Sequence, residues 1–194
     1  MLHSRTSPGT IFQSTINEVW QVSKDDWVRI MQPPSQGGGW ANTQPLQNLV
    51  DEYEMTNGRR ITDPASGYSA DDPYKDRDPR FYQTVIYNGC KWAGSTINTY
   101  VGSGVDGLNY KTGSTQTGYY MGGKMLDENS PLISSYRPGS HFLVFMRYAE
   151  TLLDYAEAQN EAAGPDQSVY DAINAIRDRP TVGMPHLPAG LSKE

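Results

Sequence analysis

The hydrophobic pattern near the C-terminus predicts two consecutive helices. The first apolar stripe consists of Phe145, Ala149, Leu152, Leu153 and Ala156. The second consists of Val169, Ala172, Ile173 and Ile176. Intervals of three and four residues place each stripe on one face of a helix, and Gly164-Pro165 separates the two helices. Ser168 with Asp171 predicts a capping box at the start of the second helix, and Pro180 predicts its end.

The alanines in this region keep side chains short, so the two helices can approach closely. We therefore expect an antiparallel helical hairpin of the tetratricopeptide kind within residues 140–179. Four acidic residues share the opposite, solvent-facing side of the first helix: Glu150, Asp154, Glu157 and Glu161. An ion pair between Arg147 and Glu150 is the ordinary expectation for this spacing.

Upstream of residue 140 the pattern predicts short elements joined by turns. Residues 11–32 suggest short extended segments, and residues 46–54 suggest a short helix that Asn57-Gly58 ends. Residues 81–87 alternate as a strand would, and Asn88-Gly89 closes it. Three Asp-Pro pairs, which begin at residues 63, 72 and 78, predict turns.

Residues 93–123 have the Gly, Ser, Thr and Tyr content of exposed loops with short strands. The chain is thus expected to be mainly α-helical with a loop-rich half. We divide it into a loop-rich region, residues 1–139, and the helical hairpin with the start of the following loop, residues 140–194.

The aromatic composition favours a ligand-binding surface. Tyrosine outnumbers phenylalanine 13 to 4, and four tryptophans are present. Tyr and Trp tolerate partial hydration, so this bias favours a binding surface over a purely apolar core. The net charge is −6 without any basic block, which argues against a nucleic-acid partner. Cys90 is the only cysteine, and the three histidines stand far apart, so the sequence predicts neither a disulfide nor a metal site, and no cofactor.

Two blocks of sequence carry a family resemblance. The C-terminal block comprises Arg147-Tyr148-Ala149-Glu150-Thr151-Leu152-Leu153-Asp154-Tyr155-Ala156-Glu157-Ala158, then Ile173-Asn174-Ala175-Ile176-Arg177-Asp178-Arg179, then Gly183-Met184-Pro185 and Leu187-Pro188. The upstream block comprises Leu49-Val50-Asp51-Glu52-Tyr53-Glu54-Met55, Asn57-Gly58, Asp72-Pro73-Tyr74, Arg77-Asp78-Pro79-Arg80-Phe81-Tyr82 and Tyr87-Asn88-Gly89. In this order, over roughly residues 40–194, they resemble the SusD/RagB family of surface glycan-binding lipoproteins of Bacteroidetes-type bacteria.

The resemblance implies a function and a place in the cell. It implies a non-catalytic protein that binds oligosaccharide, as in starch utilization systems. Its partner would be a SusC-like TonB-dependent transporter, which the protein caps in the outer membrane as a surface-exposed lipoprotein. The family's lipidated cysteine follows a signal sequence, which Cys90 does not, and family sequences continue beyond the Met-Pro and Leu-Pro loop. The chain is therefore expected to be an internal fragment, an incomplete SusD-like domain. The resemblance also implies that Arg147 and Glu150 are architectural.

Loop-borne aromatic residues are the candidate glycan-binding residues. Flat aromatic rings stack on the C–H face of a sugar while polar neighbours bind its hydroxyls. We select Trp92 and Tyr100 first, then Trp40. The alternative for each is that it packs a loop onto the core.

Four aspartates form an acidic cluster: Asp71, Asp72, Asp76 and Asp78. Such a cluster could bind calcium or supply the two carboxylates of a secreted glycoside hydrolase. The interleaved Lys75, Arg77 and Arg80 favour a third explanation, in which the acidic and basic side chains brace a turn-rich loop. A tetratricopeptide scaffold that binds peptides is a further alternative, and a second helical hairpin would distinguish it.

A glycine pattern, Gly102-x-Gly104-x-x-Gly107, matches the dinucleotide-binding motif. That motif requires a helix directly after it, so that the helix N-terminus meets the pyrophosphate. The residues that follow have loop composition instead, and we reject the nucleotide interpretation.

Overall fold

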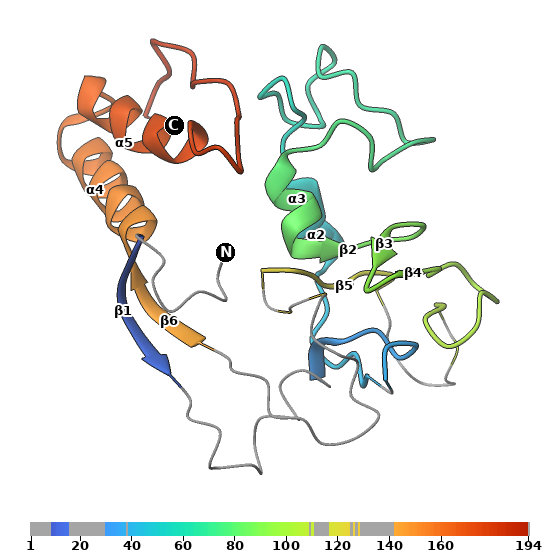
Figure 1. Cartoon of the computed structure of the whole chain (residues 1–194). Helices are drawn as coiled ribbons and strands as arrows, with labels where there is room; N and C mark the ends of the chain where they lie inside the picture. The colour runs from blue at the N-terminus through green and yellow to red at the C-terminus, as the bar shows by residue number, and fades with distance from the viewer. Residues whose placement is uncertain are drawn as a thin grey trace. The chain divides into compact units, whose positions relative to one another are not determined.

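The computed structural model divides the chain into two compact units (Figure 1). The first unit comprises Met1–Ile16, Tyr53–Arg80 and Phe142–Glu194, and the second comprises Asn17–Glu52 and Phe81–His141. The structure describes residues 9–15, 30–37, 39–108, 110, 117–124, 126, 128 and 142–193. The division expected after residue 139 stays a prediction, and both units are discontinuous in sequence, since the first takes in Tyr53–Arg80.

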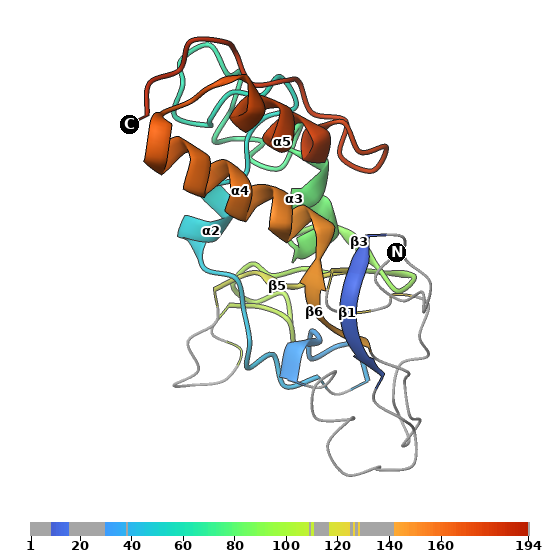
Figure 2. The ribbon, with the colours of Figure 1, turned by 90° about the vertical axis from the view of Figure 1, so that its left-hand side faces the viewer.

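Two helices dominate the first unit, as the apolar stripes predict. Helix α4 spans Tyr148–Ala163 and α5 spans Gln167–Arg177. They lie side by side in both views of the ribbon (Figures 1 and 2). Leu152 and Ala156 of α4 pack against a stripe of α5 made by Val169, Ala172 and Ile173. Gly164, with φ 86°, takes a conformation that favours glycine and ends α4.

The start of α4 differs from the prediction. Phe145 does not belong to the helix, because Phe142–Arg147 forms strand β6, which pairs antiparallel with β1, Thr10–Thr15. The rings of Phe12 and Phe145 lie 5.5 Å apart across this pair. A continuous run of apolar residues, rich in aromatic and branched side chains, favours extended backbone over a helical turn.

The acidic face of α4 is exposed to solvent, as predicted. The predicted ion pair between Arg147 and Glu150 is wrong, because neither side chain has a polar contact with the described residues. Glu150 lies in the first turn of α4, where its negative charge interacts favourably with the positive end of the helix dipole. Leu153 is exposed, so only part of the predicted apolar stripe faces α5.

The cap of α5 is two residues earlier than the predicted capping box. Asp166 is the N-cap, and its side chain accepts hydrogen bonds from the backbone N–H groups of Ser168 and Val169, at 2.9 and 3.3 Å. Aspartate in extended backbone satisfies the free N–H groups of a first helical turn. Ser168 supports this cap by donating its hydroxyl to Asp166 at 2.6 Å.

In the second unit, short strands surround one apolar cluster. Strand β2, Val85–Ile86, pairs with β5, Tyr120–Met121, and β3, Lys91–Trp92, pairs with β4, Ser95–Thr96. The buried cluster contains Met31, Ala41, Ile86, Trp92, Ile97, Tyr120 and Leu126. Helix α2, Gln47–Asp51, confirms the predicted short helix and buries Val50.

The predicted strand at residues 81–87 is wrong for most of its length. Pro79–Thr84 forms helix α3, and only Val85–Ile86 is extended. The Asp78-Pro79 pair starts this helix, although the sequence predicted a turn there. The Asp78 carboxylate accepts the backbone N–H of Arg80 at 2.8 Å, and proline suits the first helical position because it lacks an N–H.

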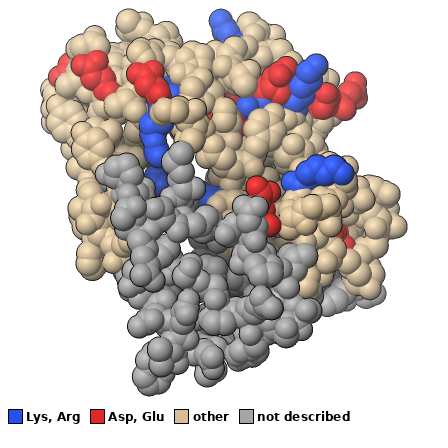
Figure 3. All heavy atoms as spheres, in the orientation of Figure 1, with Lys and Arg blue, Asp and Glu red and all other residues tan. Residues whose placement is uncertain are grey.

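Among the helices of the described residues, none combines the length and the apolar character that crossing a bilayer requires. Lys and Arg side chains lie next to Asp and Glu side chains on the described part of the face in Figure 3.

Candidate functional site

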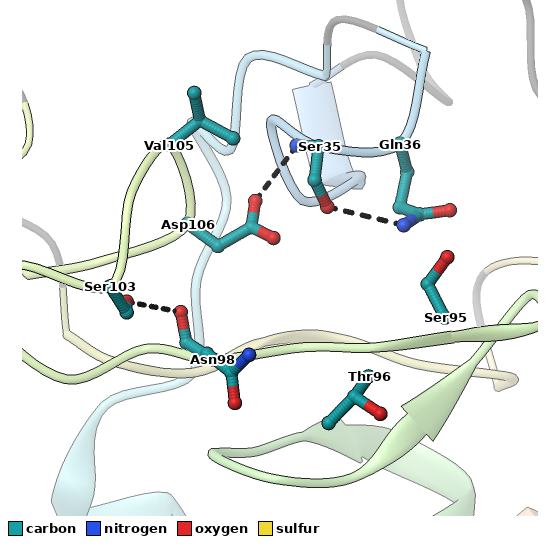
Figure 4. Close-up of a pocket in the computed structure, with 8 residues that line it drawn as sticks. All are labelled: Ser35, Gln36, Ser95, Thr96, Asn98, Ser103, Val105 and Asp106. Carbon is teal, nitrogen blue, oxygen red and sulfur yellow. Dashed lines mark hydrogen bonds between the residues drawn. The ribbon is translucent and has the colours of Figure 1, made fainter.

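A polar pocket of about 240 Å³ lies in the second unit. Three segments form its walls: residues 35–36 after Pro33-Pro34, residues 95–96 on β4, and the loop 98–106 (Figure 4). Each segment is held by backbone hydrogen bonds, for example from Gln36 N to the Pro33 carbonyl oxygen at 2.9 Å and from Leu108 N to the Thr99 carbonyl oxygen at 3.0 Å. The short turns therefore present their side chains from a fixed backbone.

The glycine pattern that resembles a nucleotide motif, residues 102–107, overlaps the loop 98–106. The described residues 101–108 form turns and bends, and most of the stretch in which the motif's helix would begin lies outside the described residues, so the rejection of that motif stays a prediction. At Gly107 an added Cβ would lie 2.7 Å from the Tyr100 carbonyl oxygen and 2.7 Å from Ser103 Oγ. Glycine at this position thus lets the loop fold back on itself, which places Asp106 against the 35–36 segment.

Asp106 is the charged group that lines the pocket. It is 6% exposed, and its Oδ1 accepts a hydrogen bond from the backbone N–H of Ser35 at 2.8 Å. Its backbone carbonyl oxygen accepts the hydroxyl of buried Tyr120 at 2.8 Å. Burial raises the pKa of the Tyr120 hydroxyl, and the nearby charge of Asp106 raises it further. Ser35 thus holds the carboxylate, and Tyr120 of β5 holds the backbone of the same residue.

Gln36 contributes an acceptor without a protein partner. The residue is 2% exposed, and its Nε2 donates to Ser35 Oγ at 3.1 Å. Its carbonyl oxygen Oε1 is buried and has no hydrogen-bond partner in the described part of the chain. A buried acceptor left unpaired costs about 1–3 kcal/mol, so this oxygen favours a donor from outside the protein. Figure 4 shows the Gln36 amide nitrogen on the side of Ser35, with the amide oxygen pointing away from the Asp106 carboxylate.

Hydroxyl and amide groups complete the lining. Ser95 and Thr96 come from β4, and Asn98 and Ser103 come from the loop. The Ser103 hydroxyl donates to the Asn98 carbonyl oxygen at 2.6 Å, which tightens the loop wall. Outside the lining, Lys91 Nζ donates to Thr96 Oγ1 at 2.5 Å from an exposed position. The pocket can therefore bind a small polar ligand through many weak, directional hydrogen bonds.

The three aromatic candidates occupy different environments. Trp92 is 8% exposed and belongs to the apolar cluster, which agrees with the packing alternative for this residue. Tyr100 and Trp40 are 58% and 50% exposed, so both rings are available to a ligand. Each aromatic neighbours a wall segment in sequence: Trp40 follows residues 35–36, Trp92 precedes β4, and Tyr100 lies within the loop 98–106. Their roles in glycan binding stay predictions.

The acidic cluster of the first unit is partly a structural brace. Asp78 is buried, and both of its oxygens accept hydrogen bonds from Arg80 Nε at 3.0 Å. Arg77 is also buried and donates to the carbonyl oxygens of Tyr53 and Pro73, both at 2.9 Å. Hydrogen bonding to Asp78 raises the pKa of Arg80. The described residues contain no group of three or more His, Cys, Asp or Glu side chains that could hold a metal.

The sequence analysis did not single out the two buried residues of the pocket lining, Gln36 and Asp106. The signals for them are faint: Gln36 follows a Pro-Pro turn, and Asp106 lies between Gly104 and Gly107. A single acid or amide in a loop is ordinarily solvated, so only the folded loop shows that these two side chains are buried.

The sequence model of the SusD family matches residues 8–191, so the chain belongs to this family. Among solved structures, a SusD-like carbohydrate-binding protein from Bacteroides fragilis is 27% identical, with a TM-score of 0.76 over 94% of this chain. A second SusD-like protein from the same species is 25% identical, with a TM-score of 0.71 over 94% of this chain. The chain spans 36% and 37% of these two proteins. No curated protein has a significant sequence match to it.

The SusD-like fold expected from the sequence is thereby confirmed, with the helical pair and the loop-rich part with short strands as its components.

Proposed function

We propose that the chain is part of a non-catalytic glycan-binding protein, and that the polar pocket of the second unit receives one sugar residue of the glycan. One observation carries the proposal: a pocket of sugar size, lined by hydroxyl and amide groups, includes a residue, Gln36, whose buried carbonyl oxygen has no donor among the described residues. A sugar offers a hydroxyl donor on nearly every carbon. Membership of the SusD family and the likeness to a carbohydrate-binding member support the same ligand class.

Binding would combine two kinds of contact. Hydroxyls of the glycan donate to Gln36 Oε1 and Asp106 and exchange hydrogen bonds with the serine and threonine hydroxyls around them. Exposed aromatic rings, Tyr100 first and Trp40 second, supply flat apolar surfaces for neighbouring sugar residues. Trp92 would act mainly by supporting β3 and β4 from the core side. Each hydrogen bond contributes only about 0.5–1.5 kcal/mol net, so the number and direction of the bonds determine the affinity.

At the level of the cell, we propose that the protein works as a surface lipoprotein of the outer membrane. There it would cap a SusC-like TonB-dependent transporter and pass oligosaccharide to it. This proposal rests on the family alone. Copurification of the transporter with the tagged protein from outer-membrane extracts supports it, whereas recovery of the protein without any transporter contradicts it.

The test of the binding function uses the purified protein and a panel of soluble polysaccharides. Calorimetric titration is expected to give saturable binding to at least one of them. Incubation with the bound polysaccharide is expected to release no reducing ends. Release of reducing ends would favour the rival function, a glycoside hydrolase that uses the carboxylates of Asp71–Asp78, and would overturn the non-catalytic proposal.

A further inference from the structure

We infer that the pocket selects its sugar by charge, accepting non-acidic sugar residues and refusing uronic or sulfated ones. This inference rests on the proposed function, since it names the class of sugar that the same pocket takes. It starts from two buried residues of the lining. Asp106 is a buried carboxylate with one oxygen bound to the Ser35 N–H, and Gln36 Oε1 is a buried carbonyl oxygen that has no partner among the described residues. Both groups accept hydrogen bonds and donate none at these atoms.

None of the described residues that line the pocket is basic, so none of them offsets the charge of Asp106. A sugar carboxylate or sulfate placed here would meet a second negative charge in a buried setting. Like charges at such an interface weaken binding strongly, because little water lies between them to screen the repulsion. Neutral sugars bring only hydroxyl groups, and amino sugars bring ammonium groups, which form charge-assisted bonds with a carboxylate.

Lys91, a basic residue that contacts the described lining, does not reverse this preference. Lys91 Nζ contacts Thr96 Oγ1 at 2.5 Å, but Lys91 is exposed and stays outside the lining. Charges in contact with solvent are screened by water and salt, whereas the Asp106 carboxylate is largely shielded from both. The buried carboxylate of Asp106 in the lining therefore determines the charge selection.

The test is calorimetric titration of the purified protein with three classes of probe. Neutral probes are glucan, mannan and xylan oligosaccharides; the amino probe is a chitosan oligosaccharide; acidic probes are oligogalacturonate and oligoalginate. We expect the best non-acidic probe to bind at least about tenfold more tightly than any acidic probe. Equal or tighter binding of an acidic probe would overturn the inference and leave the proposed function standing. Binding of no probe would overturn both.

Three variants locate the selection. Asp106→Asn keeps the acceptor for the Ser35 N–H and removes the charge. The affinity gap, which is the ratio of the Kd of the best acidic probe to the Kd of the best non-acidic probe, is therefore expected to fall at least about threefold. Asp154→Asn changes the net charge equally at an exposed site on α4 and is expected to leave the gap unchanged. Should Asp106→Asn fail to fold, Ser95→Lys adds a cation at an exposed position of the lining and is expected to narrow the gap as well. An unchanged gap in the folded Asp106 variant, or in the Ser95 variant used in its place, would overturn the inference.

Discussion

Arg177 on α5 and Glu54, in the segment after α2, form an ion pair in which Arg177 Nη2 lies 2.8 Å from Glu54 Oε2. The Arg177 side chain is buried and Glu54 is partly buried. Arg177 Nε also donates to the carbonyl oxygen of Pro185 at 2.5 Å. A single guanidinium thus connects the two sequence blocks that carry the family resemblance and the Met-Pro loop after α5. This contact gives the two sequence blocks a shared structural role.

Replacement of Glu54 by Gln is expected to destabilise the protein by about 2–3 kcal/mol, because it leaves the buried charge of Arg177 without its counter-ion. Arg179→Ala is the matched control, since Arg179 belongs to the same sequence block but is exposed. This variant is expected to change the free energy of unfolding by no more than about 0.5 kcal/mol. Urea unfolding of both variants and the wild type measures the difference. Equal destabilisation by the two variants would contradict the role assigned to the ion pair.

The sequence predicted the helical pair well because its signals are local. The apolar stripe of α5 and the break at Gly164-Pro165 lie within a few residues of what they determine. The errors come from local signals with two meanings. Asp78-Pro79 can begin a turn or a helix, and the apolar run around Phe145 can extend a helix or form a strand. A partner distant in sequence, strand β1, decides the case of Phe145. In the same way, the apolar cluster buries Trp92, which the sequence places in a loop.

The pocket could not be predicted in the same way. Gln36 and Asp106 are far apart in sequence, and Asp106 occupies only a variable position of the rejected glycine pattern. Their proximity depends on the turn at Gly107 and on the hydrogen bond from Ser35 to Asp106. The aromatic candidates were nevertheless drawn from the segments that neighbour the pocket walls, because loop-borne aromatics and polar loop walls share the same Gly- and Ser-rich sequence.

Replacement of Gln36 by Met tests the unpaired acceptor directly. Methionine has a similar size and lacks the carbonyl oxygen, so the variant removes an unsatisfied buried group along with a ligand contact. We expect the melting temperature to be unchanged or raised, while affinity for the bound glycan falls by about 1 kcal/mol. Thermal melts and calorimetric titration measure the two effects. A lower melting temperature with unchanged affinity would assign Gln36 a structural role instead.

Alanine replacements of the aromatic candidates are expected to separate binding from packing. Tyr100→Ala and Trp40→Ala should each weaken glycan binding by about 1–2 kcal/mol, the effect of losing a contact aromatic, with little change in stability. Trp92→Ala removes a buried ring of the apolar cluster and should cost about 3–5 kcal/mol of stability. Titration beside a melt of each variant checks both effects. If Tyr100→Ala and Trp40→Ala bind like the wild type, neither ring is a stacking surface.

The cap of α5 predicts a pH dependence of stability. Hydrogen bonds from Ser168 and then Gln159 lower the pKa of Asp166 below its ordinary value. The stability that this cap contributes is therefore fully present above the ordinary aspartate pKa of about 3.9 and is lost as the pH falls through the lower value of the folded state. Asp166→Asn keeps a capping oxygen that does not titrate, so its melting temperature should fall less over this acidic range than that of the wild type. Parallel curves for the two proteins would contradict this assignment.

The most direct test of the central claim is a nuclear magnetic resonance titration that follows backbone amides as the bound oligosaccharide is added. If the pocket of the second unit holds the sugar, the largest shifts fall on the three wall segments, residues 35–36, 95–96 and 98–106, with the amide of Ser35 among them. The Asp154→Asn variant should give the same pattern of shifts. The Gln36→Met variant should give this pattern too, but its shifts should saturate only at a higher oligosaccharide concentration. Shifts confined to α4 and α5, or equal in size throughout the chain, would contradict the account and place the glycan site elsewhere.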